Sequence, residues 1–256
     1  MSANSHKRTN SCIGHEGTEL MRRHGDRNFI LCPGFMNDSG LWARMEKGFK
    51  AHGQCQFADQ SQDSSFADIA RRVLRTSPTQ FILIGFSMGG YVAREVLRLA
   101  PQRVSGLVLI NTSARPDTEN VKDRNRELIK VTQSRGFRGL STKALRNSLH
   151  PSRHQDEKLL DTLQSMALRM GEAAFINQLA IKRGDDRPTL EYIKCPTLVI
   201  WSRQDALRTL KEARELEDGI PNARLEIIED SGHMTPLEQP EKLLQAVLNW
   251  FTDVDV

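Results

Sequence analysis

Short apolar blocks, separated by stretches with a helical pattern, are the main feature of the chain. Apolar runs bounded by Gly, Pro, Asn or Asp are typical of buried strands. The expected strands are 18–23 (a short edge strand), 28–32, 56–58, 81–85, 104–110, 195–201 and 224–228. The expected helices are 41–49, 64–74, 91–100, 206–216 and 240–251. This alternation predicts an α/β fold, with a mostly parallel central sheet and helices on both faces.

The alternation stops in one long segment, residues 115–187, which holds no convincing strand. Apolar residues at helical spacing mark one face over 159–170 and another over 174–181. The expected domains are a core formed by 12–114 and 188–256, a helical insertion at 115–187 and a disordered, polar tail at 1–11.

The composition is that of a globular protein with a modest positive charge. Apolar residues make up 38% and charged residues 27% of the 256 positions, and the formal net charge is +4. No apolar run approaches the roughly 18 residues of a membrane span, and the N-terminal stretch lacks the apolar region of a secretory signal. The four cysteines show no C-x-x-C spacing. We therefore expect reduced thiols in a cytoplasmic protein without a membrane partner.

A possible nucleophile lies between the strand at 81–85 and the helix that follows it. Gly85-Phe86-Ser87-Met88-Gly89 fits the G-x-S-x-G pattern, and the strand–turn–helix context is that of a nucleophile elbow. Such a turn strains the serine backbone, and a Cβ at Gly85 or Gly89 would collide with it. The alternative is a glycine-rich turn with an incidental serine.

An acid and a base follow two later strands. A serine hydroxyl needs a base within hydrogen-bond reach, and the base needs an acid to orient it. On a parallel sheet such residues lie in loops at the ends of strands. Asp205 directly follows the strand at 195–201, and His233 is the only histidine in a loop that follows a strand. Ser87, Asp205 and His233 occur in the chain order expected for a hydrolase of this architecture.

Two alternatives concern the acid. Asp205 is also suited to cap a helix that starts at Ala206. Asp230 is a second candidate, but it is only three residues from His233 in the same loop. Support from across the sheet is less natural from that position, so Asp205 is the prediction.

The oxyanion of a tetrahedral intermediate needs two N–H donors. We expect one from Met88, at the start of the helix after the serine. The other should come from the loop after 28–32, from Phe35 or alternatively from Met36, because Gly34 permits a close approach of the backbone. An ordinary Pro-Gly turn is the competing interpretation.

Five stretches carry a family resemblance. They are LCPGFMNDSGLW (31–42), LIGFSMGGYVA (83–93), LVLINTSAR (107–115), CPTLVIWSRQDAL (195–207) and EDSGHMTPLEQPE (229–241). With them the chain resembles the α/β-hydrolase fold serine hydrolases, and is similar to the group of carboxylesterases, 3-oxoadipate enol-lactonases and pimeloyl-acyl-carrier-protein methyl ester esterases. The resemblance implies hydrolysis of an ester or lactone through an acyl-serine, without metal or cofactor, under a helical lid at 115–187.

The resemblance leaves other activities open. Cofactor-free perhydrolases have a similar site, and a binding protein can keep the fold without catalysis. The expected substrate pocket is formed by Met36, Trp42, Met166, Met170 and Phe175. Apolar stripes of this kind are more often simply core.

Net positive charge is concentrated in the helical insertion. Residues 115–187 hold 15 Lys or Arg and 10 Asp or Glu, a net charge of +5. One stretch of this segment carries basic residues with no Asp or Glu between them in the sequence: Arg135, Arg138, Lys143, Arg146 and Arg153. They form either a solvated helical face or a landing site for an acidic partner such as an acyl carrier protein. Nucleic acid is not expected, because only Phe137 interleaves with these charges.

Overall fold

A six-stranded sheet organises the part of the chain that the computed structural model describes, Met1 and residues 27–254. Its strands are β1 (Arg27–Cys32), β2 (Gly53–Phe57), β3 (Phe81–Phe86), β4 (Val104–Ile110), β5 (Thr197–Ser202) and β6 (Ala223–Ile228). The order is β2-β1-β3-β4-β5-β6, and every neighbouring pair is parallel. The predicted fold class is confirmed. The expected edge strand at 18–23 and, Met1 apart, the expected tail lie outside the described residues.

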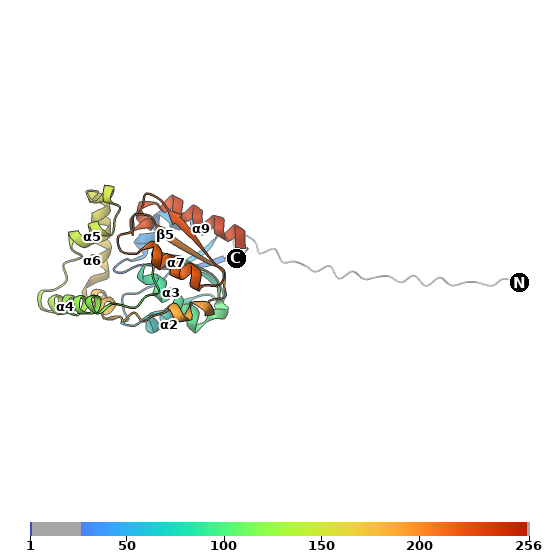
Figure 1. The fold of residues 1–256 in the computed structure, drawn as a ribbon, viewed down its shortest axis with the longest axis horizontal. Coiled ribbons are helices and arrows are strands. Elements are labelled where there is room, and N and C mark those ends of the chain that lie inside the picture. Colours follow the sequence, from blue (N-terminus) through green and yellow to red (C-terminus); the bar gives the residue numbers. More distant parts are fainter. Residues whose placement is uncertain (2–26, 255–256) are drawn as a thin grey trace.

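Helices surround this sheet (Figure 1). They are α1 (Ala43–Lys50), α2 (Phe66–Thr76), α3 (Met88–Leu99), α4 (Glu119–Arg135), α5 (Thr142–Asn147), α6 (Glu157–Ala180), α7 (Leu210–Gly219), α8 (Thr235–Glu238) and α9 (Pro240–Val254). Short 3-10 helices span Ser39–Trp42, Pro101–Arg103, Pro151–Arg153 and Arg187–Tyr192. None of the helices in the described part of the chain is both long and apolar enough to cross a membrane.

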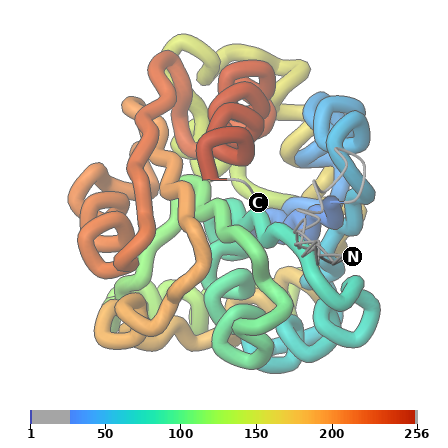
Figure 2. Tube along the Cα trace, turned by 90° about the vertical axis from the view of Figure 1, so that its right-hand side faces the viewer, coloured from blue at the N-terminus to red at the C-terminus, as the bar shows by residue number. Residues whose placement is uncertain are grey.

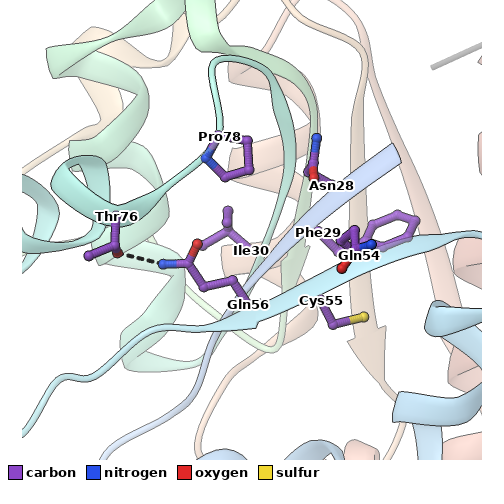
Figure 3. A pocket seen from close by; sticks show the side chains of 8 residues that line it. All are labelled: Asn28, Phe29, Ile30, Gln54, Cys55, Gln56, Thr76 and Pro78. Atoms are coloured by element: carbon purple, nitrogen blue, oxygen red, sulfur yellow. Dashed lines mark hydrogen bonds between the residues drawn. The ribbon is translucent and has the colours of Figure 1, made fainter. Parts of the chain in front are cut away.

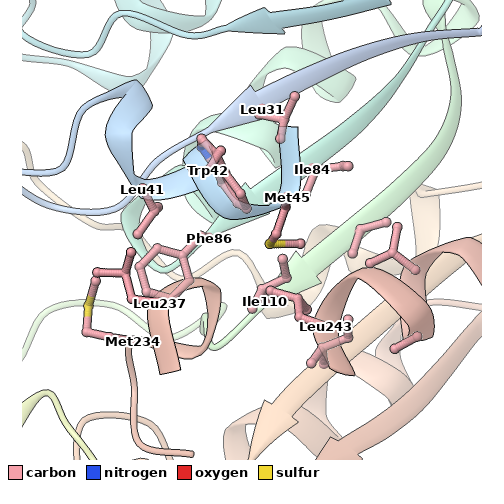
Figure 4. Close-up of a cluster of buried hydrophobic side chains, with 14 of the residues drawn as sticks. Leu31, Leu41, Trp42, Met45, Ile84, Phe86, Ile110, Met234, Leu237 and Leu243 are labelled. Carbon is pink, nitrogen blue, oxygen red and sulfur yellow. The ribbon is translucent and has the colours of Figure 1, made fainter. Parts of the chain in front are cut away.

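The sheet is buried on both faces. Along β1, Phe29 and Leu31 pack with α1 and α9, whereas Ile30 and Cys32 belong to the cluster on the other face, to which α2, α3 and α7 contribute side chains. Figure 4 shows the first of these clusters, where Leu31 and other strand residues meet side chains of α1 and α9. Because helices cover both faces, the central strands are continuous apolar runs rather than alternating ones.

The strand order changes direction at β1, because β2 and β3 lie on opposite sides of it. From β1 the chain adds β2 on one side, then returns to add β3 on the other. The α1 helix that follows β1 packs on one face, and the α3 helix that follows β3 packs on the other. Loops that diverge in this way open a crevice at the carboxyl ends of the strands, where α/β proteins bind their ligands.

The expected helical insertion is a helical segment between β4 and β5. Its helices α4, α5 and α6 lie together at the left of the sheet in Figure 1. Figure 2 views the molecule from the side opposite to these helices, with the sheet and its covering helices in front. The two ends of the insertion are joined, because Asp117 N–H donates to the Arg183 carbonyl (3.2 Å) and Asp186 N–H donates to the Ala114 carbonyl (2.9 Å). The two expected helical faces belong to α6, which is interrupted at Gly171 (φ +79°).

Some predicted boundaries are wrong. β2 covers 53–57 rather than 56–58, because this edge strand carries polar side chains such as Gln54 and Gln56 that hide the apolar pattern. α3 begins at Met88, three residues before the expected start, since the glycines after Ser87 obscured its first turn. α7 begins at Leu210 rather than 206.

Candidate active site

Ser87 occupies a sharp turn between β3 and α3. Its backbone has φ +52° and ψ −112°, a conformation that is costly for a residue with a side chain. The turn is held by its neighbours: Ser87 N–H donates to the Ile110 carbonyl (2.8 Å), and the Ser87 carbonyl accepts from the Thr112 hydroxyl (2.7 Å). These contacts tie the turn to β4 and to the segment after it, so the strained serine is kept in place.

The flanking glycines of this turn are sterically required. A Cβ at Gly85 would lie 2.6 Å from the Gly89 carbonyl oxygen, and a Cβ at Gly89 would overlap the carbonyl oxygen of Cys32. A Cβ collides at both positions, but with Gly89 and the end of β1 rather than with the serine backbone as expected. At Gly89 the obstacle is the loop after β1, so the first turn of α3 lies directly against that loop.

We expect Gly89→Ala to destabilise the fold, because neither the Cys32 carbonyl nor the start of α3 can move away alone. Overpacking of this kind costs about 1–3 kcal/mol of unfolding free energy, measured by chemical denaturation. Gly184→Ala is the matched control, since a Cβ there meets nothing within 4 Å. Equal stability of the two variants would refute this steric account of the elbow.

Ser87, His233 and Asp205 lie in one hydrogen-bonded line. Ser87 Oγ is 2.8 Å from His233 Nε2, and His233 Nδ1 is 2.7 Å from Asp205 Oδ2. A carboxylate only accepts hydrogen bonds, so Nδ1 carries the proton and Nε2 of the neutral ring accepts from the serine hydroxyl. His233 is 5% exposed, and its ring lies 5.1 Å from that of Phe86. The imidazole therefore has a fixed tautomer and a fixed orientation.

Asp205 does not cap a helix at Ala206. Its Oδ1 accepts from the backbone N–H groups of Leu207 (2.7 Å) and Arg208 (2.9 Å), which forms a turn, and Thr209 caps α7 instead. The Asp205 side chain is fully buried, and its second oxygen is left for His233. The backbone donors thus hold the carboxylate in position.

Asp230 points away from this line. Its Oδ2 lies 3.3 Å from Lys242 Nζ, and its side chain is 73% exposed. Of the two candidate acids, Asp205 is the one whose carboxylate contacts His233.

The two expected oxyanion donors lie on adjacent segments. Met88 is the first residue of α3, where a backbone N–H has no acceptor within the helix. Within the described residues, Phe35 N–H donates to no acceptor either. The alternative donor, Met36, is excluded in this conformation because its N–H donates to Gln178 Oε1 (2.8 Å). The Met36 backbone (φ +54°) turns this N–H toward the insertion.

The five expected pocket residues fall into two clusters. Met36 and Phe175 are buried in a small cluster, with Met170 packed against it, and the Phe175 ring lies 5.7 Å from that of Phe35. Trp42 and Met166 belong to the large cluster that also contains Phe86 (Figure 4). The large cluster reaches from the sheet into the insertion, and the small one from the loop after β1 into the insertion.

A groove at the β1–β2 side of the sheet lies apart from these residues. Figure 3 shows its lining, in which Gln56 Nε2 donates to Thr76 Oγ1 (2.6 Å). The lining side chains belong to Asn28, Phe29, Ile30, Gln54, Cys55, Gln56, Thr76 and Pro78. It includes neither Ser87 nor any expected pocket residue.

Cys32, at the end of β1, lies near the elbow, since its carbonyl is packed against Gly89. Burial raises the pKa of this thiol to about 12, so it stays protonated and is a poor nucleophile. Within the described residues, no group of three or more His, Cys, Asp or Glu side chains is arranged to hold a metal ion.

The part of the chain that carries these residues matches a known protein family. A family model described as the alpha/beta hydrolase fold matches residues 27–240. The chain belongs to the alpha/beta hydrolase fold family. The resemblance read from its motifs is thereby confirmed.

Several proteins similar to this alpha/beta hydrolase are esterases by name. Pimeloyl-[acyl-carrier protein] methyl ester esterase of Yersinia pseudotuberculosis serotype O:1b is 26% identical over 241 residues, which cover 88% of this chain and 93% of the relative. The protein of the same name from Photobacterium profundum is 29% identical over 193 residues, 72% and 75% of the two chains.

Solved structures share the fold. A thermophilic esterase from Thermogutta terrifontis, with malate bound, has a TM-score of 0.80 at 24% identity, over 91% of this chain and 92% of the other. The enol-lactonase from Burkholderia xenovorans LB400 has a TM-score of 0.79 at 21% identity, over 90% and 94%.

The sequence reasoning missed two residues that support His233. Asn111, at the end of β4, donates from Nδ2 to the His233 carbonyl (2.8 Å) and accepts from Ser202 N–H (3.0 Å). Glu238 is 3% exposed and accepts from His150 N–H (2.6 Å), so it joins the histidine loop to the insertion. Burial raises the pKa of Glu238. Asn111 could have been found, because it also follows a buried strand.

Proposed function

We propose that this alpha/beta hydrolase cleaves a carboxylic ester or lactone through an acyl-serine intermediate. The observation that carries the proposal is the pair of hydrogen bonds of His233, 2.8 Å to Ser87 Oγ and 2.7 Å to Asp205 Oδ2. A neutral imidazole that accepts from a serine hydroxyl, and is oriented by a buried carboxylate, is the arrangement that activates serine for acyl transfer.

The first half of the reaction forms the acyl-serine. Ser87 Oγ attacks the carbonyl carbon of the ester while its proton passes to His233 Nε2. The backbone N–H groups of Phe35 and Met88 stabilise the oxyanion of the tetrahedral intermediate, and Asp205 stabilises the imidazolium. When the intermediate collapses, the bond to the alcohol breaks and the alcohol takes the proton from His233.

Water completes the cycle. It attacks the acyl carbonyl and gives a proton to His233, and the second tetrahedral intermediate expels Ser87 Oγ, which recovers the proton. The products are a carboxylic acid and the free enzyme. In this proposal Met36, Trp42, Met166, Met170 and Phe175 line the acyl side of the site under the insertion, which acts as a lid. The buried Trp42 Nε1–H, which has no acceptor among the described residues, is a donor that a polar substrate atom could satisfy.

The test is a panel of p-nitrophenyl esters, lactones and thioesters with purified protein, followed by stopped-flow absorbance. We expect turnover of a short-chain ester, with a burst of p-nitrophenol that approaches one equivalent per chain when deacylation is slow. Turnover no faster than that of Ser87→Ala across the whole panel would contradict the proposal. Peracid formation from an acid and peroxide can be assayed on the same samples to test perhydrolase activity.

A second candidate is an esterase that acts on esters carried by an acyl carrier protein. Two observations favour it: relatives carry this function in their names, and several basic side chains of the insertion have no acidic partner among the described residues. Of the five basic residues singled out in the sequence, Arg135, Arg138, Lys143 and Arg146 have no such partner, whereas Arg153 lies 3.7 Å from Asp156. Exposed positive charge increases the association rate with an acidic protein.

Charge reversal tests this second candidate. We expect Arg138→Glu with Lys143→Glu, both exposed, to lower kcat/KM for a carrier-bound methyl ester by about 10-fold at low salt. Hydrolysis of a free p-nitrophenyl ester should not change. Lys47→Glu with Arg75→Glu is the matched control, because it changes the net charge equally on exposed positions of the core. Equal kcat/KM for the carrier-bound ester in both double variants would exclude a docking role for the insertion.

A further inference from the structure

Gln178, in the last turns of α6, reaches from the insertion to the loop that follows β1. Gln178 is 1% exposed, and both ends of its side-chain amide form hydrogen bonds. Oε1 accepts from Met36 N–H (2.8 Å), and Nε2 donates to the Gln60 carbonyl (2.9 Å). A buried amide with both ends satisfied fixes the position of its partners more strongly than an exposed one.

The hydrogen bonds continue through Gln60 back to the same loop. Gln60 is also 1% exposed, and its Nε2 donates to the Pro33 carbonyl (2.9 Å). The loop is therefore held at two points, the Pro33 carbonyl on one side of Phe35 and the Met36 N–H on the other. Fixing these two groups constrains the peptide between them, whose N–H is that of Phe35. The carbonyl of the same peptide, that of Gly34, also accepts from Asn37 N–H (3.2 Å) within the loop.

Two further contacts also join α6 to the loop after β1. Phe175, one helical turn before Gln178, packs its ring on that of Phe35, and Arg169 pairs with Asp38 (2.7 Å). The Arg169 side chain is 57% exposed, so this ion pair contributes little. Among the contacts that come from the insertion, the buried amide therefore contributes most to the orientation of this peptide. Without it, the strained backbone of Met36 (φ +54°) would lose the acceptor that stabilises it.

We propose that Gln178 is a positioning residue for the oxyanion site: by holding Met36 N–H and, through Gln60, the Pro33 carbonyl, it aims Phe35 N–H at the reacting carbonyl. The inference rests on the proposed hydrolase function. It also gives the insertion a role in the chemical step, in addition to covering the site. Stabilisation of an oxyanion depends on donors that are oriented before the reaction begins, so a loosened loop lowers kcat rather than substrate affinity.

Gln178→Met is the main test, because it keeps the length of the side chain and removes both hydrogen bonds. We expect kcat for a p-nitrophenyl ester to fall about 10- to 100-fold with KM changed less than about twofold. Binding of a trifluoromethyl ketone, whose adduct places an oxyanion at the same donors, should weaken by the same factor as kcat/KM. Asn177→Ala is the matched control: Asn177 Nδ2 donates to the Ser61 carbonyl (3.3 Å), so the variant loses a hydrogen bond from α6 outside the 33–38 loop.

Gln178→Glu keeps the test decisive if Gln178→Met does not fold. A protonated glutamic acid accepts from Met36 N–H and donates to the Gln60 carbonyl as glutamine does, whereas an ionised one cannot donate. We expect the ratio of the kcat of Gln178→Glu to that of wild type, measured at the same pH, to be closest to one at low pH. The ratio should fall progressively as the pH rises and the introduced carboxyl ionises. A wild-type kcat at every pH would overturn the proposal.

Three results distinguish a failure of the role of Gln178 from a failure of the proposed function. If wild-type protein is labelled at Ser87 by a fluorophosphonate and Gln178→Met keeps its kcat, the role of Gln178 is wrong while the proposed function stands. A raised KM with unchanged kcat in Gln178→Met would also overturn the positioning role of Gln178, because it would assign this residue to substrate binding. If wild-type protein is neither labelled nor active, the proposed function and the role of Gln178 fail together.

Discussion

Replacing Ser87 by alanine should lower kcat/KM for a p-nitrophenyl ester by about 10⁴-fold or more. The hydroxyl is the atom that forms the acyl intermediate, and the nearby Cys32 thiol cannot take its place, because that thiol is buried and its pKa is raised to about 12. The substitution removes one oxygen from a residue that is 9% exposed, so the fold should persist. Kinetics with and without Ser87 under identical conditions measure the effect.

The control for this variant is Ser105→Ala. Ser105 lies near the start of β4, at the other end of the sheet, and its hydroxyl donates to the Phe81 carbonyl (3.3 Å). Its loss should leave kcat/KM within about twofold, because distant sites act independently. Circular dichroism and thermal unfolding of both variants confirm that the fold is intact. A Ser87→Ala protein that retains more than about a tenth of wild-type activity would show that another nucleophile is used.

Asp205→Asn should lower kcat about 10³- to 10⁴-fold with little change in KM. Two backbone N–H groups, from Leu207 and Arg208, already donate to Oδ1 of Asp205. An asparagine would keep its carbonyl oxygen there and turn its NH₂ toward His233 Nδ1. The imidazole would then accept at Nδ1 and carry its proton on Nε2, where it could no longer take the proton of Ser87.

Asp230→Asn is the matched control for this prediction. The two carboxylates lie on loops at the same end of the sheet, but Asp230 is exposed and contacts Lys242. We expect its kcat to stay within about twofold of wild type. If Asp230→Asn is the more damaging of the two substitutions, the orienting acid has been assigned to the wrong residue.

Residues that follow apolar strands could be predicted from the sequence. Ser87 and His233 stand directly after or close behind strong apolar runs, and the carboxyl ends of parallel strands meet at one edge of a sheet. Their proximity therefore follows from the fold class alone. The start of α7 could not be predicted, because the two oxygens of Asp205 bind backbone donors and His233, and only the folded loop decides between a cap and a turn.

The insertion was harder to predict. α4 carries charged residues over most of its surface and buries only Asn125 and Thr132, so no apolar stripe marks it. Gln178 occupied a position on an apolar helical face, and a polar residue there is the signal of a buried amide contact. Its partner Met36 N–H is 142 residues away, and no local pattern could identify it.

Labelling by a fluorophosphonate, read by intact mass and by sequencing of the modified peptide, tests directly whether Ser87 is an activated nucleophile. We expect one adduct per chain, formed with loss of fluoride on the oxygen of Ser87, and no adduct in Ser87→Ala. A folded wild-type protein that forms no adduct, or forms it on another residue, would contradict this expectation.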